Sequence, residues 1–167
     1  MPVHTKIDKP GIYFITFTCF KWLPLIELSG GHDAVYNFFT ALLKQQHTVL
    51  AYVIMPNHLH LLLHYNGGKI LNTVIGNGKR FMAYELVRLL EQKGELNLLQ
   101  KLQTAVKDKD RSRGKKHEVW IDGFDVKECK TSLDYLHSSA QFYFNGKQRL
   151  FKVKDYREFV NWEEMYE

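Results

Sequence analysis

The chain has 167 residues, of which 45% are hydrophobic and 25% charged, and its formal net charge is +5. A chain of this length buries roughly two thirds of its unfolded surface as one domain, so we expect a single domain over residues 1–167. No run of about 18 apolar residues could cross a membrane, the first residues lack a signal core, and Cys19 and Cys129 lack a CxxC partner. These features exclude a membrane span, a disulfide framework and a zinc knuckle, and they predict a cytoplasmic protein.

The first predicted element is a strand over residues 12–20, which are rich in aromatic and β-branched side chains. Residues 32–46 follow with apolar side chains at helical spacing, which predicts an amphipathic helix. Two apolar runs, 49–54 and 59–63, are separated by a Met-Pro-Asn sequence. Because Pro56 favours a turn, these runs predict a β-hairpin.

A longer helix is predicted over residues 70–92, ended by Gly94. Its expected apolar stripe comprises Leu71, Val74, Ile75, Met82, Leu86 and Leu89. Residues 97–116 predict a short helix that leads into a basic loop. Further strands are expected at 117–121 and 124–126 and a last helix at 133–144.

The order of these elements is strand, helix, strand, strand, helix, strand. This order is typical of an α+β sandwich of the ferredoxin-like or RRM-like kind. We therefore expect a mainly antiparallel sheet with helices on one of its faces.

Positive charge is concentrated between residues 101 and 116, where seven basic residues face only Asp108 and Asp110. A concentrated basic segment attracts polyanions such as nucleic acid, although a solvated loop has the same composition. The seven basic residues are Lys101, Lys107, Lys109, Arg111, Arg113, Lys115 and Lys116.

His58 and His60 stand two positions apart at the start of the second hairpin strand. Successive side chains of a strand point to opposite faces, so these two imidazoles share one face. Two imidazoles on a rigid strand predict a divalent-metal site, and His64 falls on the same face. Spacing alone fits equally well with histidines that are hydrogen-bonded on a partly covered sheet.

Tyr84 lies two residues from both Met82 and Leu86, which places it about 200° around the helix from the core stripe. It should therefore point away from the core, among polar neighbours that include Arg80 and Arg88. A tyrosine there is free to reach a phosphate, and either arginine could neutralise charge beside it. An ordinary exposed tyrosine gives the same pattern.

The run from Tyr52 to Leu62, with its Met-Pro-Asn-His-Leu-His core, closely resembles the hallmark of the HUH single-tyrosine transposases, including the REP-associated tyrosine transposases. The resemblance extends to Tyr13–Thr16, to Lys79–Tyr84, to Trp120 and to Phe124–Cys129, and so covers most of the chain.

The resemblance implies a DNA strand transferase that nicks single-stranded DNA near hairpin ends. It implies that His58 and His60 hold Mg²⁺ or Mn²⁺, and that Tyr84 attacks a phosphodiester to give a 5′-phosphotyrosine link and a free 3′-OH. It also implies a homodimer, in which relatives often complete each site with the tyrosine helix of the other subunit. We expect DNA contacts from Lys79, Arg80, Arg88, Arg111, Arg113, Lys115 and Lys116.

Two departures from the family are visible. Relatives usually have a third metal ligand one helical turn beyond the tyrosine, where this chain has Arg88, a side chain that cannot ligate a metal. His64, Glu85, Glu91 or water must then complete the metal shell. The family's Tyr-Ile-His-x-Asn-Pro string is cut short near Tyr135, so the C-terminal part, about 130–167, is expected to be shortened.

Three functions remain open from the sequence. The first is the metal-dependent nicking enzyme described above. The second is a catalytically silent or domesticated nucleic-acid-binding protein of the same fold. The third is an RRM-like RNA binder, which should carry aromatic side chains rather than a histidine pair on the central sheet face.

Overall fold

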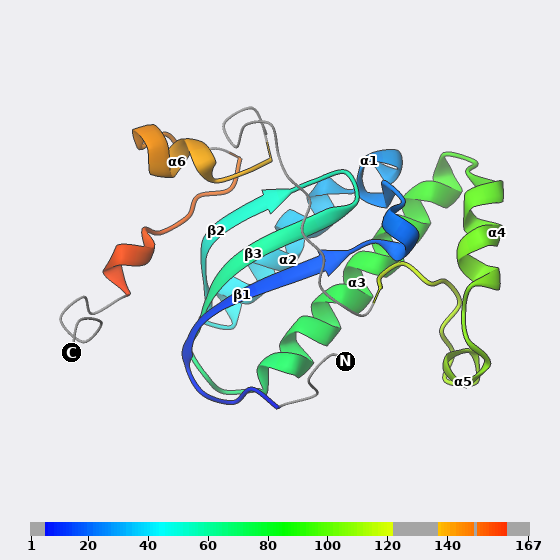
Figure 1. The fold of residues 1–167 in the computed structure, drawn as a ribbon, viewed down its shortest axis with the longest axis horizontal. Coiled ribbons are helices and arrows are strands. Elements are labelled where there is room, and N and C mark those ends of the chain that lie inside the picture. Colours follow the sequence, from blue (N-terminus) through cyan, green and yellow to red (C-terminus); the bar gives the residue numbers. More distant parts are fainter. Residues whose placement is uncertain (1–5, 122–136, 149, 160–167) are drawn as a thin grey trace.

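The computed structural model describes residues 6–121, 137–148 and 150–159 (Figure 1). Its centre is a three-stranded antiparallel sheet in the order β1-β3-β2, built from β1 (Gly11–Thr18), β2 (Thr48–Ile54) and β3 (His58–Tyr65). The predicted hairpin is confirmed as β2 and β3, and its turn is closed by a 2.8 Å bond from the Met55 N–H to the His58 carbonyl.

The sheet has one face in the core and one face turned away from the helices. Apolar side chains of alternating positions, such as Phe17 on β1 and Leu61 on β3, are buried in the hydrophobic core. The intervening positions put Thr16 and Thr18 of β1 opposite His60 and His58 of β3. The predicted alternation therefore places both histidines on the face opposite the helices.

Helices α1 (Leu25–Ser29), α2 (His32–Lys44) and α3 (Leu71–Gln92) form the layer behind the sheet (Figure 1). The two long helices match the predicted ones, and Gly94 follows α3 with a left-handed φ of 73°. The expected apolar stripe needs one correction: Leu90 is fully buried and Leu89 only half-buried. Leu90 lies one turn beyond Leu86, which keeps it on the core side.

The helices α2 and α3 approach closely at Gly78. A Cβ atom at this position would come within 2.2 Å of the Phe38 ring. A larger residue would force α3 away from α2, so the glycine sets how the tyrosine-bearing helix is placed on the core.

Beyond α3 the chain forms α4 (Leu96–Thr104) and α5 (Asp108–Arg111), and then runs to the open edge of β1. The strand predicted over 117–121 is reduced to one antiparallel bridge, between Cys19 and Trp120. The strand predicted over 124–126 lies outside the described residues.

The helix predicted over 133–144 is wrong at residues 137–139, and residues 133–136 lie outside the described residues. The rest of the range belongs to α6 (Ala140–Asn145). Ser138 forms a bridge with Val53, and the Tyr52 N–H donates to Ser139 Oγ at 2.9 Å. The exposed edge of β2 offers unpaired backbone groups, and pairing with them competes with the helical hydrogen bonds of this segment.

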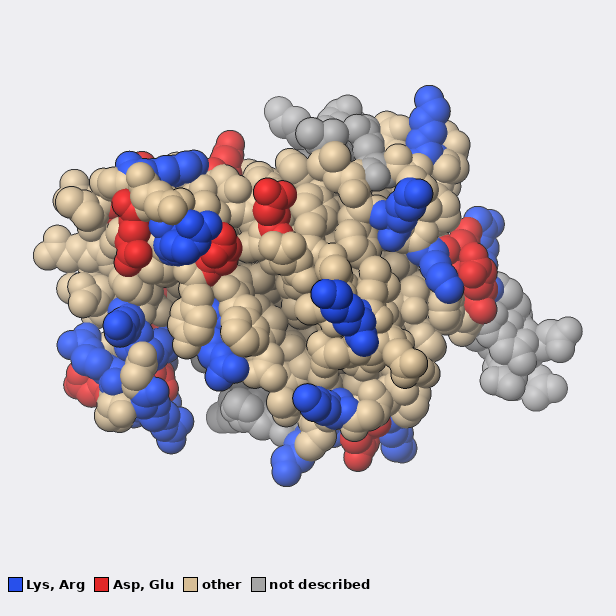
Figure 2. All heavy atoms as spheres, turned by 180° about the vertical axis from the view of Figure 1, so that it is seen from behind, with Lys and Arg blue, Asp and Glu red and all other residues tan. Residues whose placement is uncertain are grey.

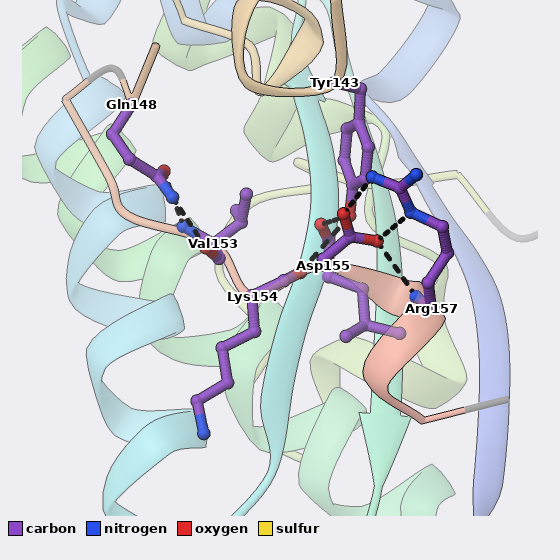
Figure 3. A network of polar contacts seen from close by, with 7 residues as sticks. Tyr143, Gln148, Val153, Lys154, Asp155 and Arg157 are labelled. Atoms are coloured by element: carbon purple, nitrogen blue, oxygen red, sulfur yellow. Dashed lines mark hydrogen bonds and ion pairs between the residues drawn. The ribbon is translucent and has the colours of Figure 1, made fainter. Parts of the chain in front are cut away.

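The C-terminal segment continues along the same edge (Figure 3). The Tyr143 hydroxyl donates to the carbonyls of Leu50 and Lys154, and the Gln148 amide exchanges two hydrogen bonds with the backbone of Val153. A last short helix, η2 (Tyr156–Glu158), follows. Among the described helices, none combines the length and the apolar character needed to cross a membrane.

Candidate metal and nucleic-acid site

The histidine pair is placed by β3, whose first residue is His58. The ring centroids of His58 and His60 are 4.8 Å apart, and the ring planes are inclined by 74°. The two imidazoles therefore lie side by side at the start of the strand that is central in the sheet, as the alternation predicts.

His58 is held from two sides. Asn57 donates through Nδ2 to the Trp22 carbonyl at 3.0 Å, which turns its Oδ1 toward His58 Nδ1 at 2.7 Å. Nδ1 must then be the donor in this contact, which leaves the lone pair of the neutral ring on Nε2. The Trp22 ring packs edge-on against His58, with centroids 5.7 Å apart, and the His58 side chain is buried.

The short helix that carries Trp22 has an uncommon backbone conformation. Lys21 and Trp22, in the short helix η1 (Phe20–Trp22), have positive φ angles of 49° and 58°. Non-glycine residues adopt this region at a cost, and such residues cluster at functional sites. Here the turn brings both the Trp22 carbonyl and its ring to the side of His58.

His60 is anchored across the sheet. Its Nδ1 lies 2.9 Å from Thr16 Oγ1 on β1, and the Phe14 ring stacks against it with a centroid distance of 5.4 Å and an angle of 20°. Burial lowers the pKa of His60, so the ring is neutral at pH 7. A neutral imidazole that is hydrogen-bonded through one nitrogen is the form that ligates metals.

Two adjacent imidazoles, with ring centroids 4.8 Å apart, offer two nitrogen ligands for one divalent ion. Among the described residues no third histidine, cysteine or carboxylate joins the pair. His64 shares the sheet face but pairs with Ile12 at the far end of β3, where its ring packs on Phe159. Glu85 is bonded to Arg88 on α3. Water or a phosphate oxygen is therefore left to complete such a shell.

Tyr84 lies in a different place, on the exposed side of α3. Its side chain is 64% exposed, as its helical position predicts. It lines a cleft of about 810 Å³ between α3 and residues 113–120. The Trp120 Nε1–H donates to the Lys79 carbonyl at 2.8 Å, and this bond fastens the second wall of the cleft to the helix.

The cleft gathers six of the seven residues that the sequence suggested for DNA contacts. They are Lys79, Arg80, Arg88, Arg113, Lys115 and Lys116. Glu91 is the single carboxylate among the described residues of the lining. Arg88 and Lys115 form ion pairs with Glu85 and Glu118, and the side chains of both cations are exposed and within reach of a phosphate.

The seventh residue, Arg111, lies outside this cleft. It lines a second hollow of about 370 Å³ together with Gln103 and Thr104. Lys115 and Lys116 border both hollows. Figure 2 shows Lys and Arg side chains, with Asp or Glu among them, gathered at the end of the molecule that carries α5.

His117 also lines the cleft, a role that sequence analysis missed because the residue was assigned only to a strand. Burial lowers its pKa, and the neighbouring Lys116 lowers it further, whereas Glu91 acts in the opposite direction. His117 therefore adds no positive charge at neutral pH. The Cys19 thiol near the sheet edge is fully buried; burial raises its pKa to about 12, so it is not a nucleophile at neutral pH.

The tyrosine and the histidine pair are not brought together within one chain. The described residues that line the Tyr84 cleft include neither His58 nor His60. The pair lies on the face of the sheet opposite α2 and α3, while Tyr84 is on the side of α3 that is turned away from the core. The anchoring roles of Asn57, Thr16 and Trp22 were also missed, since they depend on a strand register that no motif encodes.

Comparisons of the chain with protein-family models, with curated proteins and with solved structures give no significant match. The class of the protein therefore follows from its own fold and surface features. It is an α+β protein in which a three-stranded antiparallel sheet packs against helices, with a paired-histidine site on the sheet and a basic cleft beside its longest helix.

Proposed function

We propose that this protein is a metal-dependent enzyme that nicks single-stranded DNA near hairpin ends and transfers the strand, as the resemblance to HUH single-tyrosine transposases implies. The observation that carries the proposal is the histidine pair, with both rings anchored through Nδ1 by Asn57 and Thr16. Anchored imidazoles on one strand face are expected of a metal site and exceed what two chance surface histidines require.

The proposal includes a ferredoxin-like arrangement of the sheet. Residues 119–121 run antiparallel beside the end of β1, with the Ile121 N–H donating to the Thr18 carbonyl at 2.9 Å. If this segment counts as a fourth strand, the order becomes fourth, first, third, second, which is the order of that fold. The single bridge at Trp120 supports this assignment.

The Tyr84 hydroxyl is the proposed nucleophile. Its oxygen forms a bond to the phosphorus of the scissile phosphodiester, the bond from phosphorus to the 3′ oxygen breaks, and the phenol proton passes through water to that oxygen. The products are a 5′-phosphotyrosine and a free 3′-OH, and a second 3′-OH can reverse the step. The cations of the cleft offset the negative charge that develops on the phosphoryl oxygens.

His58 and His60 would hold the ion, and Asn57 and Thr16 would keep the rings in position. A divalent ion bound there supplies Lewis-acid polarisation of the phosphate and orientation of the leaving 3′ oxygen. Mg²⁺ prefers oxygen ligands, so of the two expected ions Mn²⁺ suits a pair of imidazoles better.

A homodimer explains how the histidine pair and Tyr84, which lie apart within one chain, can form one site. Tyr84 faces away from the sheet of its own chain, and a second copy can present its α3 to the histidine face. We therefore propose that Tyr84 of the partner subunit completes each site, in agreement with the expectation from the resemblance.

The test is formation of a covalent adduct between the protein and DNA on a denaturing gel. Hairpin-bearing single-stranded oligonucleotides from beside the gene are incubated with the protein and Mn²⁺. We expect an adduct that Tyr84→Phe abolishes, a loss of at least about 10⁴-fold, since the nucleophile itself is removed. Tyr143→Phe is the matched control, because the Tyr143 hydroxyl is engaged by Leu50 and Lys154. An adduct that survives Tyr84→Phe contradicts the assignment.

A domesticated nucleic-acid-binding protein is the second candidate. The separation of the Tyr84 cleft from the histidine pair favours it, because a basic cleft needs no metal to bind a strand. This candidate is preferred if the wild-type protein binds single-stranded DNA in a salt-sensitive way but forms no adduct with any oligonucleotide. The RNA-binding alternative is less well supported, since the central strand β3 presents His58 and His60 on the face where aromatic residues are required.

A further inference from the structure

Thr18 is an unusual residue of the histidine face. Its side chain is 1% exposed, and among the described residues its hydroxyl oxygen has no hydrogen-bond partner. Thr18 pairs directly with His58 across β1 and β3, so the two side chains share a face with Cβ atoms about 5 Å apart. A buried polar group without a partner requires an explanation.

The neighbouring threonine on the same strand behaves differently. Thr16, the partner of His60, uses its hydroxyl to anchor that ring. His58 is anchored instead by Asn57, so the ring has no need of Thr18 in the same role. The two cross-strand pairs are thus alike in position, but only one of the two hydroxyls is used for holding a histidine.

A metal ion held by His58 and His60 would need hydrogen-bond acceptors nearby for its bound water, and the Thr18 hydroxyl is one. Two imidazoles leave several positions of a divalent ion to water, and each bound water must donate hydrogen bonds to acceptors nearby. The two polar side chains that are hydrogen-bonded to the pair are already engaged: Thr16 with His60 and Asn57 with His58. The Thr18 hydroxyl remains as an acceptor beside the pair.

We propose that Thr18 Oγ1 accepts a hydrogen bond from a water molecule bound to the divalent ion of His58 and His60, and so is a positioning residue of the metal site. This inference rests on the proposed function, because it requires that the pair binds an ion. It adds a residue of β1 to a site that sequence patterns locate on β3 alone.

The experiment measures the effect of Mn²⁺ on the protein without DNA. Thermal unfolding is followed over a MnCl₂ titration for wild type, Thr18→Val and Thr18→Ser. Quenching of tryptophan fluorescence gives a second measure, because the Trp22 ring lies 5.7 Å from that of His58. Thr48→Val is the matched control, since Thr48 pairs with His64 at the far end of the face.

We expect Thr18→Val to raise the Mn²⁺ concentration at half-saturation by roughly 10-fold or more, in the range for loss of an outer-sphere partner. Thr18→Ser should retain wild-type affinity, and Thr48→Val should change nothing. Without metal, Thr18→Val should melt no lower than wild type, because the hydroxyl that it removes has no partner.

The outcomes separate this inference from the function on which it rests. If wild type responds to Mn²⁺ and Thr18→Val responds at the same concentration, the role of Thr18 is refuted and the metal site stands. If wild type shows neither a thermal shift nor quenching, the metal site itself is refuted, and the role of Thr18 with it. A Thr18→Val protein that melts much lower without metal would show that the hydroxyl has a structural partner.

Discussion

The histidine face and the tyrosine cleft are built in opposite ways. On the face, each ring is tied through one nitrogen by Asn57 or Thr16 and is packed against an aromatic neighbour, Trp22 or Phe14. In the cleft, the functional groups are long side chains on a solvent-exposed surface, and Tyr84 is 64% exposed.

The difference agrees with the two roles proposed for these regions. Metal ligation depends on distances and angles that must be held within a fraction of an ångström, so its residues belong on rigid strands with supporting bonds. Attraction of a polyanion acts over about 8 Å at physiological salt and tolerates mobile cations. In the proposed function the histidine face provides a fixed geometry and the cleft provides positive charge, so substitutions can remove one without the other.

Removal of a ligand should give the largest effect. We expect His60→Ala to lower Mn²⁺-dependent nicking by roughly 10³-fold, because polarisation of the phosphate is worth several kcal/mol. Binding of single-stranded DNA, measured by fluorescence anisotropy without metal, should change less than about twofold, since the cleft is untouched. Equal losses of nicking and binding would contradict the division between the two regions.

Removal of charge should give a moderate effect on binding alone. With Lys115→Gln and Lys116→Gln combined, the slope of log affinity against log salt should fall by about 1.4, or about 0.7 for each phosphate contact with a single strand. The Mn²⁺ concentration at half-saturation should not move. The combined Lys152→Gln and Lys154→Gln variant is the control, because these lysines are exposed on the C-terminal segment and do not line the cleft.

A change of pH should have the smallest effect on the cleft. Burial holds the pKa of His117 below its ordinary 6.5, so this ring is neutral from pH 7 to pH 9. DNA affinity measured without metal should vary by less than about twofold there, and should rise only as the pH falls through the lowered pKa and His117 gains a proton. His117→Gln should remove that rise, and a rise that persists would assign it to another group.

The elements that sequence analysis located correctly are those with a strong local signal. The hairpin around Pro56 and the shared face of His58 and His60 follow from alternation and turn chemistry, and the outward direction of Tyr84 follows from helical geometry. The long helix was misjudged only in its last turn, at Leu90.

The parts that could not be predicted depend on contacts between distant segments. The pairing of β1 with β3, which puts Thr16 and Thr18 beside the histidines, has no signature in either strand. The folding of residues 113–120 against α3 depends on one side-chain bond, from Trp120. Ser138 and Ser139 belong to a run that reads as helix, yet they pair with β2, because tertiary contacts override a weak local preference.

The fastening of the C-terminal segment limits how two copies can meet. The outward backbone groups of β2 are occupied in turn: the Leu50 carbonyl by Tyr143, both groups of Tyr52 by Ser139, and the Ile54 N–H by the His137 carbonyl. A neighbouring molecule therefore cannot add a strand beside β2 unless the C-terminal segment first detaches. Self-association must therefore use another part of the molecule, such as the open edge of β1, the sheet face that carries the histidine pair or the long helix α3.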